Sequence, residues 1–210
     1  MFDFLTLAQH CAPTVHSDTM RRIVQVESAF NPYAIGVVGH RLERQPRDHA
    51  EAVATAQWLN ANHYNFSVGL AQVNQSNFKR YGLTLNTAFT PCTNLRAGSA
   101  ILNECFDRAK AQREDQQALR AAFSCYYSGN FLTGFTHGYV AKVVNADGKP
   151  ITLAQQVPRF ETTTHHSAVP IQPAASIALK TKPTVRTTVT QHSSPRSETV
   201  ERQSTSALIF

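Results

Sequence analysis

The residues that can build a packed core are confined to the first 160 positions of this 210-residue chain. Every aromatic residue except Phe210 and all nine glycines lie there. Residues 161–210 instead contain 17 Ser or Thr and four Pro. That composition buries too little apolar surface to offset the entropy lost when a chain is ordered. We therefore expect one globular domain over residues 1–160 and a disordered Ser/Thr/Pro-rich tail over residues 161–210, and two large domains are excluded.

The excess of positive charge is modest and spread along the chain. Lys and Arg outnumber Asp and Glu by 15 to 11 up to residue 160 and by five to three beyond it, for a formal net charge of +6. Such a surface favours encounter with anionic polymers, the bacterial cell wall among them. It lacks the dense Arg/Lys run of a nucleic-acid reader, so we expect no nucleic-acid partner. No stretch approaches 18 apolar residues, so we expect no membrane span.

Four cysteines occur without the short spacings of a zinc site: Cys11, Cys92, Cys105 and Cys125. Two disulfides and buried free thiols are both compatible with this count, and four cysteines allow three pairings. If residues 93–110 form one helix, Cys105 lies about 18 Å along the axis from Cys92. That separation exceeds the roughly 7 Å limit for the Cα atoms of a disulfide, which disfavours the Cys92–Cys105 pairing.

A secretory signal would lie at the start of the sequence, and the candidate metal ligands lie in the tail. The first ten residues contain an acid where a secretory signal has basic residues, and they include no long apolar run, so we expect no ordinary signal peptide here. In the tail, His165, His166 and His192 have no other ligand types around them. We therefore expect no metal and no other cofactor.

Hydrophobic periodicity predicts a domain made mainly of helices. Helices are expected over residues 3–11, from Ser17 as N-cap to Asn31-Pro32, and over 48–62, 75–81, 93–110, 115–127 and 139–144. Residues 33–39 suggest an extended piece and a turn, and the alternating apolar residues of 66–70 predict a short strand. Many helices with little strand indicate a predominantly α, α+β domain.

Glu27 breaks the pattern of its own helix. Met20, Ile23 and Val24 form an apolar stripe, and Glu27 occupies the next position on it. A carboxyl buried there must either pair with a cation or keep its proton through a raised pKa. The protonated form is what a general acid needs near neutral pH. The pattern alone is therefore compatible with a catalytic acid, with a structural ion pair and with a carboxylate at a helix end that reaches water.

Four segments, in order, resemble motifs of the lytic transglycosylases. Residues 27–32 (ESAFNP) resemble the family's E-S-x-x-N-P segment, whose glutamate is the catalytic acid, and residues 69–74 (GLAQVN) its G-L-x-Q-[IV] segment. Residues 124–130 (SCYYSGN) resemble the A-Y-N-[AS]-G segment, and residues 138–143 (GYVAKV) the closing Y-V-x-x-V. The resemblance covers about residues 5–145 and implies the lysozyme-like fold of soluble lytic transglycosylases and goose-type lysozyme. Within the family, the match is nearest to the VirB-type enzymes of type IV secretion and conjugation.

The resemblance implies cleavage of the β-1,4 bond between N-acetylmuramic acid and N-acetylglucosamine in peptidoglycan. Glu27 would act first as acid and then as base while a 1,6-anhydro ring closes, and the substrate's acetamido group would stabilise the oxocarbenium. Substrate assistance explains how one carboxylate suffices where ordinary glycosidases use two. The substrate-binding residues implied are Ser28, Gln72, Asn74, Tyr126 and Tyr139. Each also has a plainer interpretation, as a helix cap, a turn residue bonded to local backbone, or a core aromatic.

The chain departs from the family pattern at two positions. Ala71 stands where many relatives carry Met, which we expect to change the packing around the sugar. Tyr127 stands where they carry Asn, so the role of that Asn is either lost or supplied by Asn130.

A polar insert separates the first two motifs and contains three acidic residues: Glu43, Asp48 and Glu51. We interpret them as solvated charges. The alternative is that one of them serves as the second carboxylate of a hydrolase.

These inferences lead to one expected function and two alternatives. The expected function is a lytic transglycosylase of the periplasm or cell envelope that opens peptidoglycan for a type IV secretion or conjugation apparatus. Its partners would be glycan strands and, through residues 161–210, components of that apparatus. The first alternative is a lysozyme-type hydrolase of the same bond. The second is a non-catalytic glycan-binding assembly factor that acts through its tail.

Overall fold

The computed structural model describes residues 3–146 and 168–169 of the chain. The elements in chain order are α1 (Phe4–Cys11), α2 (Ser17–Ser28), β1 (Ile35–Val37), β2 (Arg41–Leu42), α3 (His49–Ala61), β3 (Phe66–Val68), β4 (Val73–Asn74), η1 (Gln75–Asn77), η2 (Thr87–Phe89), α4 (Pro91–Lys110), α5 (Asp115–Ser128), α6 (Thr133–Thr136), α7 (Tyr139–Val144) and β5 (Ala168–Val169). The predicted domain boundary at residue 160, most of the predicted tail and its three histidines lie outside the described residues.

A small antiparallel sheet is formed by β1, β3 and β4, with β3 in the middle. Ile35 pairs with Val68 on one side of β3, and Ser67 pairs with Asn74 on the other. All other large elements of the described part are helices. The predominantly α, α+β class predicted from periodicity is confirmed, and the arrangement is consistent with a lysozyme-like fold.

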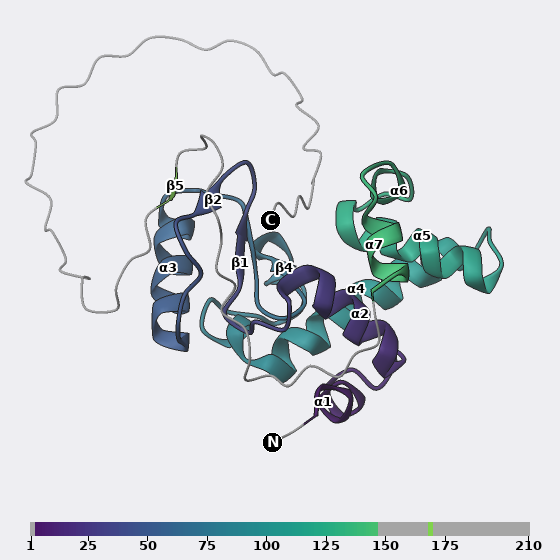
Figure 1. Cartoon of the computed structure of the whole chain (residues 1–210), viewed down its shortest axis with the longest axis horizontal. Coiled ribbons are helices and arrows are strands. Elements are labelled where there is room, and N and C mark those ends of the chain that lie inside the picture. Colours follow the sequence, from purple (N-terminus) through teal and green to yellow (C-terminus); the bar gives the residue numbers. More distant parts are fainter. Residues whose placement is uncertain (1–2, 147–167, 170–210) are drawn as a thin grey trace, which may run out of the picture.

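The helices and the sheet form two lobes joined by α2 and α4 (Figure 1). The sheet lobe contains the three-stranded sheet and α3, and the helical lobe contains α5, α6 and α7. Each lobe has its own apolar core, centred on residues such as Phe66 and Leu59 in the first and Phe123 and Val140 in the second. A third cluster packs α1 against α2, with the ring of Phe4 5.1 Å from that of Phe30.

Two disulfides fasten α4 at its two halves. Cys11 at the end of α1 bonds to Cys92 in the first turn of α4, and Cys105 in α4 bonds to Cys125 in α5. No described cysteine is free. The pairing of Cys92 with Cys105, disfavoured by the length of the helix between them, is absent.

Three predicted helix boundaries are wrong by a few residues. Ser17 is already helical, and the N-cap is His16, whose Nδ1 accepts from the Asp18 N–H at 3.3 Å. The same helix ends at Ser28, ahead of the predicted stop, because Ala29 and Phe30 adopt positive φ angles of 48° and 64°. The helix predicted over residues 75–81 is only the 3-10 turn η1.

Candidate active site

Glu27 lies in the last turn of α2 with no exposed surface. Its Oε1 accepts a hydrogen bond from the Tyr139 hydroxyl of α7. Its Oε2 is buried and has no hydrogen-bond partner among the described residues. Neither the ion pair nor the carboxylate that reaches water is the arrangement of Glu27, because among the described residues its side chain is bonded only to a neutral phenol and it has no exposed surface.

Burial dominates the protonation of this carboxyl. It raises the pKa of Glu27 from 4.5 to about 8, and the hydrogen bond from Tyr139 lowers that pKa only in part. A carboxyl with such a pKa keeps its proton at neutral pH. The pKa of Tyr139 and that of Tyr126 are both raised well above 10, first by burial and then by the negative charge that Glu27 would carry. Both phenols therefore remain hydrogen-bond donors at neutral pH.

Residues 69–74, which we call the Gly69 turn, are held by side chains from three helices. Ser28 of α2 donates to the Leu70 carbonyl at 2.8 Å, and Tyr126 of α5 donates to the Ala71 carbonyl at 2.5 Å. Asn94 of α4 accepts from the Ala71 N–H at 2.7 Å and donates to the Val68 carbonyl at 2.9 Å. These four bonds tie this part of the sheet lobe to α2, α4 and α5, and the one from Ser28 comes from the end of α2 that carries Glu27.

Glycine is required at position 69 by both conformation and space. Its φ is +80°, and a Cβ added there would lie 2.4 Å from Asn94 Nδ2 and 2.8 Å from the Ala88 carbonyl oxygen. Gly98 of α4 permits a second close approach, because a Cβ at that position would meet the Ala71 Cβ at 2.5 Å. Ala71 is fully buried, so its side chain packs against α4.

Gln72 and Asn74 are buried, and both direct their amide groups at nearby protein atoms. Gln72 donates to the carbonyls of Ala34 and Gly69, at 3.0 and 2.9 Å. Asn74 donates to Asn65 Oδ1 at 2.7 Å, and its own Oδ1 accepts from the Ser76 N–H at 3.0 Å. Their amide hydrogens thus shape the turn, and a sugar would have to compete for them.

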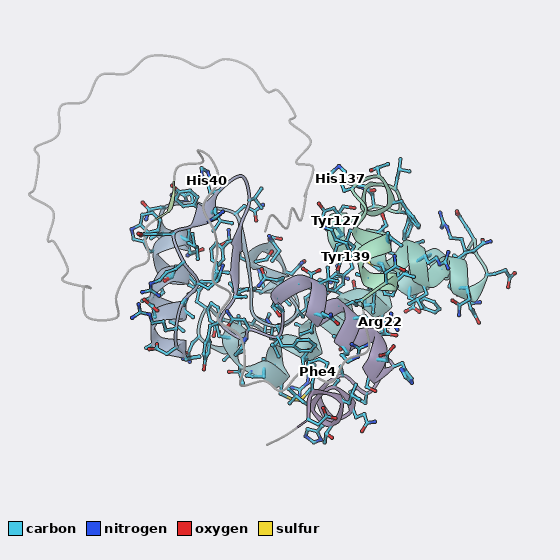
Figure 2. The ribbon with its side chains drawn as sticks, viewed as in Figure 1. Phe4, Arg22, His40, Tyr127, His137 and Tyr139 are labelled. Carbon is cyan, nitrogen blue, oxygen red and sulfur yellow. A yellow bond between two sulfur atoms is a disulfide. The ribbon has the colours of Figure 1, made fainter. Side chains whose placement is uncertain are left out.

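Tyr127, His137 and Tyr139, which we call the aromatic row, lie along the edge of the helical lobe that faces the sheet lobe (Figure 2). The rings of Tyr127 and Tyr139 stack with centroids 4.7 Å apart and planes inclined by 19°. The Tyr127 hydroxyl lies 3.3 Å from His137 Nδ1. The row therefore runs from the exposed His137 to the buried phenol that contacts Glu27.

The position of the family Asn is occupied by this stack. Asn130, considered as its replacement, donates to Thr133 Oγ1 at 2.9 Å and accepts from the Leu132 and Thr133 N–H groups at 2.9 and 2.8 Å. Its amide is committed to the start of α6, whereas Tyr127 is the residue that touches Tyr139.

A groove opens between β4, α4 and α5 on one side of the site; we call it the α4–α5 groove. Eight polar or aromatic side chains line it, those of Gln72, Asn74, Asn77, Arg80, Tyr81, Glu104, Arg108 and Tyr126. Three of the predicted substrate-binding residues, Gln72, Asn74 and Tyr126, therefore share one groove. Ser28 and Tyr139 do not line it, and they lie instead beside and against Glu27.

The interpretation of the polar insert as solvated charges is wrong for Glu51. This side chain is buried, pairs with the Arg44 guanidinium and accepts from the Arg47 N–H at 2.7 Å. The hydrogen bond from Arg44 is the main cause that holds its pKa below the ordinary value. Asp48 is exposed and caps α3 through the Glu51 N–H at 2.9 Å, and Glu43 is exposed. None of the three contacts Glu27.

Asn94 is the residue of the site that sequence reasoning missed. It is fully buried, and besides its bonds to the Gly69 turn it donates to the Ala88 carbonyl at 2.8 Å. The available signal was an Asn just inside the most regular helix of the chain, a place where its propensity is poor.

The described residues provide neither a metal centre nor a membrane-spanning helix. They contain no group of three His, Cys, Asp or Glu side chains placed to hold a metal ion. Among them, no helix has the length and apolar content needed to cross a membrane.

Comparisons with known proteins agree with these observations. The family described as "Transglycosylase SLT domain" matches residues 4–142. The chain is 52% identical over 182 residues to the type IV secretion system protein virB1 of Brucella abortus and to that of Brucella suis, which covers 82% of this chain and 76% of each relative. It is 40% identical over 147 residues to the protein virB1 of Rhizobium radiobacter, covering 69% of this chain and 60% of that one. No solved structure matches.

Proposed function

Because the chain belongs to the transglycosylase SLT family and is a lytic transglycosylase, we propose that it cleaves the MurNAc–GlcNAc β-1,4 bond of peptidoglycan with Glu27 as its one catalytic carboxylate. The observation that carries this proposal is the state of Glu27. The carboxyl is buried, is protonated at neutral pH and has one oxygen without a hydrogen-bond partner in the described part of the chain. A buried acid with a free oxygen is poised to give its proton to a substrate atom.

The proposed reaction uses this carboxyl twice. Glu27 donates its proton to the glycosidic oxygen as the bond to the muramyl C1 breaks, and the acetamido group of the same sugar stabilises the positive charge at C1. The resulting carboxylate accepts the proton of the muramyl 6-hydroxyl while the oxygen of that hydroxyl bonds to C1. The products are a 1,6-anhydromuramyl end and a free 4-hydroxyl on N-acetylglucosamine, and Glu27 regains its proton.

The surroundings of Glu27 support a mechanism with a single carboxylate. Burial and the Tyr139 hydrogen bond are the causes of its pKa shift, and neither is a second acid. Retaining and inverting glycosidases place two carboxyl groups at about 5 to 9.5 Å from each other. Within the polar insert, the carboxylate of Glu51 is held by Arg44, so it serves that ion pair and not Glu27.

Tyr139 holds the carboxyl in place while the reaction proceeds. Its hydroxyl donates to Oε1, which leaves Oε2 as the oxygen that meets the substrate. Because Glu27 has no exposed surface, binding of the glycan must displace a side chain that covers Oε2. The substrate would extend into the α4–α5 groove past Tyr126, Gln72 and Asn74.

The setting we propose is the bacterial cell envelope. Two of the relatives are named type IV secretion system proteins, which supports a role in opening peptidoglycan for such an apparatus, and hence a periplasmic location. Residues 161–210 remain a proposed recruitment segment. Deleting them while residues 1–160 are kept tests that part separately from the chemistry.

The experiment is the digestion of purified peptidoglycan with wild type and Glu27→Gln, followed by mass analysis of the products. We expect anhydromuropeptides from wild type and a fall of about a thousandfold or more with Glu27→Gln, because a neutral amide cannot transfer the proton. Products heavier by one water would instead establish the lysozyme-type hydrolase. Full secretion with Glu27→Gln, lost only when residues 161–210 are deleted, would favour the non-catalytic assembly factor.

A further inference from the structure

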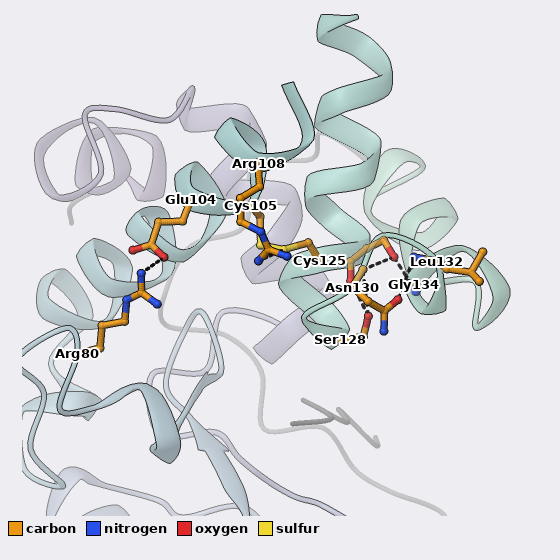
Figure 3. Close-up of a disulfide and its surroundings, with 10 residues drawn as sticks. Arg80, Glu104, Cys105, Arg108, Cys125, Ser128, Asn130, Leu132 and Gly134 are labelled. Carbon is orange, nitrogen blue, oxygen red and sulfur yellow. Dashed lines mark hydrogen bonds and ion pairs between the residues drawn. A yellow bond between two sulfur atoms is a disulfide. The ribbon is translucent and has the colours of Figure 1, made fainter. Parts of the chain in front are cut away.

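The α4–α5 groove carries a net positive charge close to the proposed catalytic acid. Arg80 and Arg108 line it, and its one acidic lining residue is Glu104. Glu104 is paired with Arg80 at 2.6 Å, so the charge of that arginine is neutralised within the groove. Figure 3 shows this pair on one side and Arg108 beside the Cys105–Cys125 disulfide on the other.

Arg108 has no carboxylate partner among the residues that the structure describes. Its contacts are of two other kinds. Nη1 lies 3.7 Å from Cys125 Sγ, and the guanidinium carbon lies 5.2 Å from the centre of the Phe131 ring. Both contacts orient the side chain without neutralising it, and the residue is exposed to solvent. The guanidinium is therefore fixed in direction and retains most of its five donors for a ligand.

The groove also connects this cation to the reaction centre. Tyr126 lines the groove and donates to the Ala71 carbonyl, next in the chain to the Leu70 carbonyl that accepts from Ser28, the neighbour of Glu27. The neighbour of Tyr126 in the chain, Cys125, is the residue whose sulfur faces Arg108. A glycan strand bound at Glu27 and running along the groove would bring the substituents of its sugars to Arg108.

Those substituents are anionic. The lactyl ether of each muramic acid bears a short peptide with free carboxylates, or a carboxylate of its own where the peptide has been removed. Guanidinium and carboxylate form paired, charge-assisted hydrogen bonds, the strongest class available at a partly exposed site.

We propose that Arg108 is a substrate-binding residue that holds a carboxylate of the branch on muramic acid. This inference rests on the proposed function, since it assumes that peptidoglycan occupies the groove. Arg108 thereby favours strands that carry the branch over plain N-acetylglucosamine polymers.

The test measures binding without turnover, by retention of Glu27→Gln and Glu27→Gln/Arg108→Gln on peptidoglycan strands coupled to beads. Three forms of the polymer are compared: intact, stripped of peptides by an amidase, and treated with carbodiimide and methylamine so that every carboxylate becomes a neutral amide. Arg113→Gln is the matched control, because Arg113 contacts the same Phe131 ring at 4.9 Å but does not line the groove. Arg108→Lys tests whether charge alone restores binding.

We expect Arg108→Gln to weaken binding of intact peptidoglycan about tenfold and to leave binding of the amidated polymer unchanged. Arg108→Lys should recover part of that loss, and Arg113→Gln should change neither value. A loss confined to the intact polymer assigns the ligand to the peptide, and a loss that persists on the stripped polymer assigns it to the lactyl carboxylate. An equal loss on intact and amidated polymers, or no loss on either, overturns the proposal. Failure of wild type to cleave would refute the proposed function and leave this binding result standing.

Discussion

The Gly69 turn and the aromatic row both reach the end of α2, but different interactions hold them. The turn is buried and forms hydrogen bonds of 2.5 to 2.8 Å with Ser28, Asn94 and Tyr126, on three separate helices. The aromatic row rests on a ring stack between Tyr127 and Tyr139, and its outer bond, from Tyr127 to His137, measures 3.3 Å at an exposed position.

This contrast indicates that the two regions act on Glu27 in different ways: the Gly69 turn fixes its position, and the aromatic row sets the pKa of its carboxyl. The turn fixes where α2 ends relative to the sheet lobe, because Ser28, next to Glu27, bonds directly to Leu70. The row reaches the carboxyl itself through Tyr139. Changes in the turn should therefore act mainly on folding stability, and changes in the row mainly on how the carboxyl titrates.

Removing the disulfides should give the largest losses of stability. A loop of 20 residues closed by Cys105–Cys125 contributes about 3 kcal/mol in the chain-entropy description, and one of 81 residues closed by Cys11–Cys92 about 4.5 kcal/mol. Denaturant unfolding of the two double-serine variants measures these values. Cys105→Ser/Cys125→Ser should also weaken binding of peptidoglycan, because this bond lines the α4–α5 groove. Equal binding by both variants would show that the groove does not depend on the bond.

Gly69→Ala should destabilise the fold by about 3 kcal/mol, because the new methyl group meets a backbone oxygen at 2.8 Å in a left-handed conformation. The matched control is Gly82→Ala. Gly82 also has a positive φ, +66°, but has open space around its Cβ direction, so that variant should cost only about 1 kcal/mol. Free energies of unfolding from urea titration give the comparison. Similar values for the two variants would mean that the turn is not tightly packed.

Because the Glu27 carboxyl is buried, the free energy of unfolding should decrease as the pH rises. The pKa of Glu27 is raised from 4.5 to about 8 on folding, so the folded protein binds more protons than the unfolded chain between these values. The stabilising effect is complete below pH 4.5 and decreases by about 1.4 kcal/mol for each pH unit up to pH 8. Glu27→Gln cannot titrate, so the difference in unfolding free energy between it and wild type should slope by that amount. If the unfolding free energies of the two proteins change in parallel with pH, the Glu27 carboxyl is solvated.

Tyr139→Phe should have the smallest effect, a rise of the Glu27 pKa by about one unit or less. The hydroxyl stabilises the carboxylate, so its loss favours the protonated acid. The alkaline limb of the pH–activity profile should therefore move to higher pH. Tyr127→Phe keeps the ring stack and removes only the contact with His137, so its limb should stay in place. If the alkaline limbs of both variants move, the effect comes from the aromatic row as a whole and not from the Tyr139 hydroxyl that contacts Glu27.

The helix-rich class and the anomaly at Glu27 could be predicted from the sequence because both are local patterns of period 3.6. The contact of Glu27 with Tyr139 joins positions 112 residues apart, so no spacing rule reveals it. Tyr139 was singled out as a residue of the site only by the resemblance to a family.

The features that could not be predicted are contacts between residues that the fold brings together from different segments. Glu51 was interpreted as solvated because nothing in the insert shows that Arg44 folds back onto it. Asn94 looked like an ordinary helical residue, since its three hydrogen-bond partners lie outside its helix, in β3, the Gly69 turn and η2. Tertiary partners of this kind decide buried polar positions, and periodicity carries no information about them.

The bond between Cys11 and Cys92 has a consequence for damage by proteases. The two cysteines enclose α2, the three-stranded sheet and α3 in one covalent loop. A single cut anywhere between them leaves both fragments attached, so a nicked molecule gains only the one water of the hydrolysis and stays in one piece until the disulfide is reduced. An enzyme exposed to proteolysis can therefore retain its acid and its Gly69 turn in one particle after its chain has been broken.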